Sequence, residues 1–187
     1  QIYYGKTFSQ GFTHLGVLSP KFCLKTGLSS AHVLSAIDQH DDIDVFMMSP
    51  CKLSSRFFNV WTQGDCSHPG LMELMQTIFR CAKIDDAVLG LRMGYEVECY
   101  SNYWVASRRF WDLYMSIAER IYRAIYSSES LQKKAFSPVF LMNGELGTVT
   151  HFPFIFERIF STVLTLYGSS FRCFDLGADR GRRSFEL

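Results

Sequence analysis

The sequence predicts an α/β protein in which a mixed central sheet is flanked by helices. Three observations favour this class. A strand-like segment, a helix-like segment and a second strand-like segment follow one another before Pro50. Three longer segments after His68 repeat apolar residues at helical spacing. Apolar residues make up 48% of the 187 residues, which is enough for a sizeable buried core.

The strand–helix–strand unit begins with residues 14–18, HLGVL, which predict a short buried strand. After a loop, Ser29 or Ser30 can cap a helix over 31–39. The second strand, IDVFMM, covers 43–48, and this order of elements favours a layered α/β arrangement. The residues expected to face inward from the helix are Val33, Leu34 and Ile37.

The middle of the chain predicts two amphipathic helices, over 69–82 and 107–127, and the letters YWVA between them predict a strand. Residues 51–68 and 83–94 are polar and predict irregular structure. The residues expected to face inward from the two helices are Leu71, Leu74, Met75, Ile78, Phe79, Phe110, Leu113, Tyr114, Ile117, Ile121 and Ile125.

The last part of the chain predicts one more helix, which begins at Pro153 because the first turn needs no amide donor there. Residues 128–137 predict a solvated connection, and the letters PVFLM after it predict a short strand or an extended loop. FRCFDL at 171–176 predicts an edge strand. We interpret 1–187 as a single domain in which 178–187 form a flexible tail.

Composition narrows the class of partner. A net charge of +1 creates no overall electrostatic attraction to nucleic acid or to an acidic membrane surface. No uninterrupted apolar run reaches about eighteen residues, so we expect no membrane span. Six cysteines without a CxxC pair indicate reduced thiols in a cytoplasmic protein. The many aromatic residues are compatible with a homodimer, and the sequence leaves the oligomeric state open.

Residues 19–27, SPKFCLKTG, form the lysine loop, the first of four candidate sites. Lys21, Lys25 and Thr26 offer two positive charges and a hydroxyl that could hold a phosphate. The loop does not match GxxxxGK[ST], and two surface lysines on a turn are the favoured alternative.

The second candidate surrounds Trp61, where Gln63, Asp65 and His68 follow within one segment. An aromatic ring can stack on the apolar face of a sugar while amide and carboxylate groups bind its hydroxyls. A capped helix start with a buried Trp is the alternative interpretation.

The third and fourth candidates are Asn102 with Trp104, and Glu157 with Arg158. The first pair either lines a pocket or belongs to a core strand that follows a turn. The second pair interrupts the most apolar stretch of the chain, where a charge must be paired or used. It is therefore either a site or a rim salt bridge.

Acid–base catalysis needs a carboxylate in a cleft, and the candidates are Glu157, Asp65 and Asp44. Asp42-Ile43-Asp44 also has the acid-x-acid form that holds a divalent metal in sugar-nucleotide transferases. Because it precedes a strand instead of following one, we interpret it as a helix terminus and turn. No convincing metal motif is present, and dependence on Mg²⁺ or Mn²⁺ stays open.

Five segments together resemble a family. They are HLGVLSPKFCLKTG, DVFMMSP, NVWTQGDCSHPGLMELMQ, YSNYWVASRRFWDLY and FPFIFERIFSTVL, and they span roughly residues 13 to 166. Their order is similar to small GT-A-like glycosyltransferases of bacterial surface-polysaccharide clusters. Members of this family usually begin with a strand and a loop that bind the nucleotide base. Little precedes residue 13 here, so the resemblance is to a form shortened in that N-terminal region.

The resemblance implies a nucleotide-sugar donor and a polysaccharide or glycolipid acceptor. It implies that the lysine loop and Arg158 bind the donor diphosphate, that Trp61, Gln63, Asp65 and His68 face a sugar, that Asn102 and Trp104 line the same cleft, and that Glu157 is the base or orients it. Two other classes stay open. One is a non-catalytic carbohydrate- or nucleotide-binding module, and the other is a protein whose aromatic surfaces serve assembly.

Overall fold

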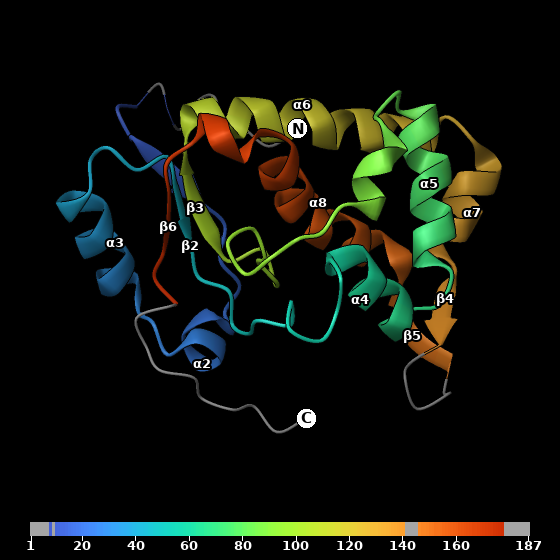
Figure 1. Ribbon diagram of the computed structural model, residues 1–187, viewed down its shortest axis with the longest axis horizontal. Helices are drawn as coiled ribbons and strands as arrows, with labels where there is room; N and C mark the ends of the chain where they lie inside the picture. Colours follow the sequence, from blue (N-terminus) through green and yellow to red (C-terminus); the bar gives the residue numbers. More distant parts are fainter. Residues whose placement is uncertain (1–7, 9, 141–145, 178–187) are drawn as a thin grey trace. The chain divides into compact units, whose positions relative to one another are not determined.

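The computed structural model describes Phe8 and residues 10–140 and 146–177 (Figure 1). It is a mixed α/β structure, with a four-stranded mixed sheet, a two-stranded sheet and seven α-helices within the described residues. The chain divides into two compact units. Unit 1 comprises Gln1–Lys52, Cys99–Leu113 and Tyr167–Leu187, and unit 2 comprises Leu53–Glu98 and Tyr114–Leu166. The single domain stays a prediction, and the predicted tail at 178–187 lies outside the described residues.

Unit 1 contains the larger sheet, whose strands are β1 (His14–Gly16), β2 (Val45–Met47), β3 (Trp104–Ser107) and β6 (Cys173–Asp175). Their order is β1-β3-β2-β6, and Figure 1 shows these strands side by side. Strand β3 is antiparallel to both neighbours, whereas β2 and β6 are parallel. This arrangement confirms a mixed sheet and places the C-terminal strand at its edge, as the sequence predicts.

Two helices precede β2 in unit 1. Helix α3 (Ser30–Gln39) begins at the predicted cap, Ser29, whose side chain accepts a hydrogen bond from the backbone of His32. Helix α2 (Phe22–Thr26) occupies the lysine loop, so the prediction of a loop is wrong there. A five-residue helix is too short for a periodic signal, and its end is set by Gly27 at a φ of 69°.

The core of unit 1 combines α2, α3 and the sheet. One core cluster contains buried Phe22, Leu28, Val33, Met48, Tyr103 and Val105, with Ile37 packed against it. Leu34 was expected to face inward, but it is 60% exposed. The apolar stripe of α3 is therefore narrower than the sequence predicts.

Unit 2 is mostly helical. Its elements are α4 (Val60–Ser67), α5 (Leu71–Cys81), a 3₁₀ turn at Asp86–Gly90, most of α6 (Arg108–Tyr126), α7 (Glu129–Phe136), β4 (Pro138–Phe140), β5 (Leu146–Thr150) and α8 (His151–Tyr167). The whole predicted inward face of α5 is buried. Helices α4 and α7 lie where irregular structure was predicted, and β5 was not predicted. None of the helices in the described residues combines the length and apolar character needed to cross a bilayer.

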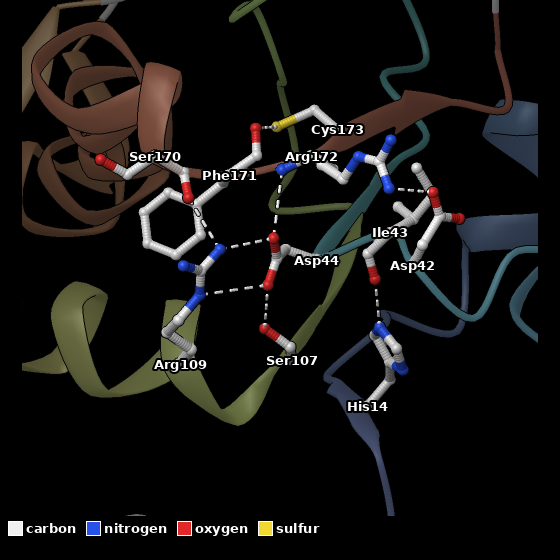
Figure 2. A network of polar contacts seen from close by, with 10 residues as sticks. All are labelled: His14, Asp42, Ile43, Asp44, Ser107, Arg109, Ser170, Phe171, Arg172 and Cys173. Atoms are coloured by element: carbon white, nitrogen blue, oxygen red, sulfur yellow. Dashed lines mark hydrogen bonds and ion pairs between the residues drawn. The ribbon is translucent and has the colours of Figure 1, made fainter.

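Asp44 lies just before β2 and connects three segments of unit 1 (Figure 2). Its carboxylate accepts hydrogen bonds from Arg109 Nη2 at 2.7 Å, from Ser107 Oγ at 3.1 Å and from the backbone N–H of Arg172 at 3.1 Å. Asp42 pairs with the guanidinium of Arg172. Arginine side chains thus neutralise both carboxylates of the acid-x-acid pattern, which agrees with its interpretation as a turn.

We expect Asp44→Asn to lower the free energy of unfolding by about 1–2 kcal/mol at pH 7, because hydrogen bonds to a charged partner are lost. Burial alone would raise the pKa of Asp44, but the hydrogen bonds from Arg109, Arg172 and Ser107 and the charge of Arg109 together lower it below 3.8. A lowered pKa in the folded state contributes stability above the ordinary carboxyl pKa, and this contribution is lost as the pH falls through the lowered value.

Urea unfolding at pH 7 and at about pH 2.5 measures this difference. The gap between wild type and Asp44→Asn should shrink at the lower pH. Asp38→Asn is the control, because Asp38 is exposed on α3. A gap that is equal at both pH values would contradict the role given to the Asp44 charge.

Candidate functional site

Helices α4 and α8 bring together the largest group of predicted site residues, all within unit 2. We call Gln63, His68, His151, Glu157 and Arg158 the α4–α8 cluster. The position of α4 is fixed by Asn59, which is 2% exposed and whose side-chain oxygen accepts hydrogen bonds from the backbone of Trp61 and Thr62. The amide of Asn59 also donates to the carbonyls of Leu89 and Leu91, at 2.8 and 2.9 Å. This buried cap explains why a helix forms in a polar segment.

Arg158 is the centre of the cluster, and its side chain is only 3% exposed. Its Nε donates to the carbonyl of Val60 at 2.8 Å, and its Nη2 donates to Gln63 Oε1 at 2.6 Å. Its Nη1 donates to the carbonyl of Phe154 at 3.0 Å and to Glu157 Oε2 at 3.2 Å. A buried guanidinium is thus paired with a carboxylate and joins α4 to α8.

Gly64 makes room for this guanidinium, and the sequence interpretation overlooked it. A Cβ at Gly64 would lie 2.9 Å from Arg158 Cζ and 2.7 Å from Leu71 Cδ2. Side-chain carbons essentially never approach this closely, so α4 needs a glycine where Arg158 crosses it. A glycine inside a helical segment is the sequence signal that could have indicated this close approach.

The imidazole of His68 lies near the guanidinium of Arg158, and His151 lies near His68. His68 ends α4, and its ring stacks on that of Phe154 with centroids 3.6 Å apart. Burial, the charge of Arg158 and the proximity of His151 lower the pKa of His68 to about 4. His151 begins α8 and was not among the predicted residues. The ring atom Nδ1 of His68 and both ring nitrogens of His151 are buried and have no hydrogen-bond partner.

Asp65 and Trp61 take structural positions in unit 2. Asp65 Oδ1 accepts hydrogen bonds from the backbone of Gly70 and Met72, at 3.1 and 2.9 Å, and so caps α5, whose own N-cap glycine has no side chain. Trp61 is 0% exposed, and its indole N–H donates to Thr162 Oγ1 at 2.9 Å. Both positions favour the capped helix with a buried Trp over direct contact with a sugar.

Unit 1 brings the lysine loop to the segment that contains Asn102. Lys25 Nζ donates to Ser101 Oγ at 3.2 Å and lies 6.0 Å from the centre of the Tyr103 ring. Ser101 and Asn102 both have left-handed backbone, with φ of 63° and 53°, and Asn102 Oδ1 is buried without a partner. Consecutive left-handed residues that are not glycine store strain, which clusters at functional sites.

The other predicted residues of unit 1 stand apart from this contact. Thr26 Oγ1 donates to the carbonyl of Phe22 at 2.8 Å and completes the last turn of α2. Lys21 is exposed at the start of the same helix. Trp104 is 4% exposed and packs against Trp111, with ring centroids 4.5 Å apart, so it is a core residue of β3.

The α4–α8 cluster can recognise hydroxyl groups and move a proton. The neutral imidazole of His68 can donate and accept hydrogen bonds, and the half-buried Glu157 carboxylate lies against a fixed positive charge. Across the described ranges, no three His, Cys, Asp or Glu side chains gather in a way that could hold a metal ion. The polar side chains of the α4–α8 cluster can take part in acid–base and hydrogen-bonding chemistry.

Comparison with known proteins adds no family to this description. No family model, curated protein or solved structure matches the chain. The functional argument therefore depends on the residues of this chain.

Proposed function

We propose that the chain is a glycosyltransferase with a GT-A-like layout, which transfers a sugar from a nucleotide-sugar donor to a surface polysaccharide or glycolipid. One observation supports this proposal above the others. Two of the three segments on which the resemblance depends most, QGDCSHPG and FERIFS, meet in the α4–α8 cluster through the hydrogen bond between Arg158 and Gln63, which are 95 residues apart. Their polar side chains thus form one group in unit 2. The third segment is SPKFCLKTG in unit 1.

In this proposal Glu157 accepts the proton of the acceptor hydroxyl. The freed oxygen forms a bond to the anomeric carbon of the donor, and the bond from that carbon to the diphosphate breaks with its electron pair leaving on the diphosphate. The guanidinium of Arg158 already donates hydrogen bonds to Glu157 and Gln63. In this proposal Arg158 therefore orients the carboxylate of Glu157. The prediction that Lys21, Lys25 and Thr26 bind a phosphate concerns unit 1 alone and is separate from this step.

The second candidate function is a non-catalytic module that binds a carbohydrate or a nucleotide. It is favoured because Asp65, one of the two predicted catalytic carboxylates, caps a helix instead. The two candidates differ in one result. A transferase loses turnover when Glu157 is neutralised, whereas a binding module has no turnover to lose.

We expect at least one uridine, guanosine, cytidine or thymidine diphosphate sugar to raise the melting temperature, because a ligand of the native state stabilises it. Glu157→Gln should keep this thermal shift, since a glutamine oxygen can still accept from Arg158. It should lose transfer by about 100-fold or more, because a general base contributes roughly 10²–10⁴-fold. The measurements are thermal unfolding with each donor and transfer to a polysaccharide acceptor.

Glu119→Gln is the matched control, because Glu119 is an exposed glutamate of α6 whose partner Arg123 is also exposed. It should leave binding and transfer unchanged. Flat melting curves with every donor would refute donor binding. Turnover of the wild-type rate in Glu157→Gln would remove Glu157 from the mechanism.

A further inference from the structure

A row of touching aromatic rings crosses three helices of unit 2, and we call it the aromatic strip. Two rings lie one turn apart on α6, one ends α7, and two lie one turn apart on α8. The successive ring centroids are 4.4, 5.9, 4.6 and 4.9 Å apart, so each ring contacts the next. In this order the rings are Tyr122, Tyr126, Phe136, Phe152 and Phe156.

The strip lies at the surface of the molecule. Tyr122, Tyr126 and Phe136 are 46, 45 and 41% exposed, and Phe152 and Phe156 are half-buried. A single exposed apolar residue needs no explanation, but exposed rings that touch one another form a patch, and such patches mark places where a partner binds. Because an aromatic side chain covers roughly 150–250 Å², the three exposed rings leave on the order of 250 Å² uncovered.

The core of unit 2 is built from other faces of the same helices. Helix α6 buries Ile121 and Ile125, and α8 buries Ile155 and Ile159. Each of these residues directly precedes or lies within three residues of a ring of the strip, so it points in a different direction from the helix axis. The strip is therefore a second apolar face, separate from the one that packs inward.

The strip is bordered by charges of both signs. On α7, Glu129 and Lys133 are exposed one turn apart, and Lys133 precedes Phe136 by three residues on the same face of the helix. On α6, Arg123 Nη2 lies 3.5 Å from Glu119 Oε2. These four residues carry no net charge, so the border does not attract a polyanion such as nucleic acid or an acidic membrane surface.

A second copy of the chain fits this surface best. A two-fold axis places the same patch on both sides of an interface, so a border of one sign would repel its own copy, whereas a border with both signs can pair acids with bases. A standard interface buries about 800 Å² on each partner, with aromatic residues enriched at its centre and charged residues at its rim. The exposed rings supply about a third of this area, and the exposed charged side chains around them supply the rim.

We propose that the aromatic strip is the interface through which two copies of this chain form a two-fold symmetric dimer. The strips of the two copies lie against each other, and α7 of one copy faces α7 of the other, so that Glu129 and Lys133 meet residues of opposite charge. The proposal goes beyond the proposed function and does not depend on it, because none of the residues of the α4–α8 cluster belongs to the strip. With so few exposed rings, we expect a dissociation constant in the micromolar range.

The test is sedimentation velocity of the intact chain between about 1 and 200 µM, a range that brackets the expected dissociation constant. The sedimentation coefficient should rise from that of a monomer to that of a dimer. The double variant Tyr122→Ala, Tyr126→Ala should weaken the dimer by about tenfold or more, because aromatic residues at the centre of an interface carry much of the affinity. Phe58→Ala is the control and should dimerise like the wild type, since Phe58 is a 50% exposed ring of unit 2 outside the strip.

An exchange of charges tests the symmetry of the contact. Glu129→Lys gives the border on α7 two bases, and Lys133→Glu gives it two acids, so each variant alone should dimerise about three- to tenfold more weakly than the wild type. A one-to-one mixture of the two variants should recover the lost affinity, because unlike borders then face each other. Both residues are exposed, so the exchange leaves the core intact. Should the double alanine variant fail to fold, Phe136→Ala and this mixture give the same information.

The proposal is overturned if the wild-type chain sediments as a monomer at every concentration, because the strip would then bind a different partner, such as a saccharide. It is also overturned if the strip variants dimerise as tightly as the wild type, or if Phe58→Ala weakens the dimer equally. Association that continues beyond a dimer would contradict a closed two-fold contact. A mixture of the two charge variants that associates no better than either alone would contradict the facing of the two α7 helices.

Discussion

Replacing Arg158 with Met is expected to lower the free energy of unfolding by about 3–5 kcal/mol, the cost of removing one partner from a buried ion pair. The variant leaves Glu157 without its neighbouring cation, and it removes the hydrogen bonds from the guanidinium to the carbonyls of Val60 and Phe154. Met fills much of the same volume, so the loss reports the hydrogen bonds and the charge more than a cavity. Urea unfolding at pH 7 gives the measurement.

Two further variants make this result specific. Arg123→Met is the control, because its side chain is 79% exposed and its pair with Glu119 is a surface pair. It should cost less than about 0.5 kcal/mol. Arg158→Lys should recover less than half of the loss, since an ammonium group cannot reproduce the planar fork. Equal effects of Arg158→Met and Arg123→Met would contradict the central position given to Arg158.

Gly64→Ala is expected to destabilise unit 2 by about 1–3 kcal/mol, the usual cost of overpacking. Alanine would gain up to about 1 kcal/mol in helix propensity over glycine. The added carbon would nevertheless lie within 2.9 Å of Arg158 Cζ and 2.7 Å of Leu71 Cδ2, and the guanidinium cannot retreat without breaking its hydrogen bonds. Steric overlap therefore outweighs propensity.

Gly90→Ala is the matched control in the same unit. A Cβ at Gly90 would meet nothing within 4 Å, so this variant should be neutral within about 0.5 kcal/mol. Thermal or urea unfolding of both variants measures the difference. A Gly64→Ala protein as stable as wild type would show that Arg158 does not cross α4 as closely as described.

The parts of the fold that the sequence predicted well are those in which many residues share one pattern. Helix α5 places every expected apolar residue in the core, and β2 and β6 occupy the predicted segments. Helices α2, α4 and α7 were missed because they are short and polar. Their ends are set by single residues, such as Gly27, Asn59 and Ser128, and not by a repeating apolar face.

The candidate site was predictable in its residue types but not in its contacts. Glu157 and Arg158 were identified because charges interrupt an apolar helix, yet the partner Gln63 lies 95 residues away and no local pattern indicates it. The polar segment around Trp61 was ambiguous, since the residue types that bind a sugar are also those that cap helices. His151 was missed because one histidine at a helix start carries no pattern of its own.

The pairing of β6 with β2 has a consequence for synthesis. β2 ends at Met47 and its parallel partner spans Cys173–Asp175, so more than a hundred residues are translated between the two strands. The pairing of this edge and the contact of Phe174 with Phe46 therefore depend on residues that are translated late.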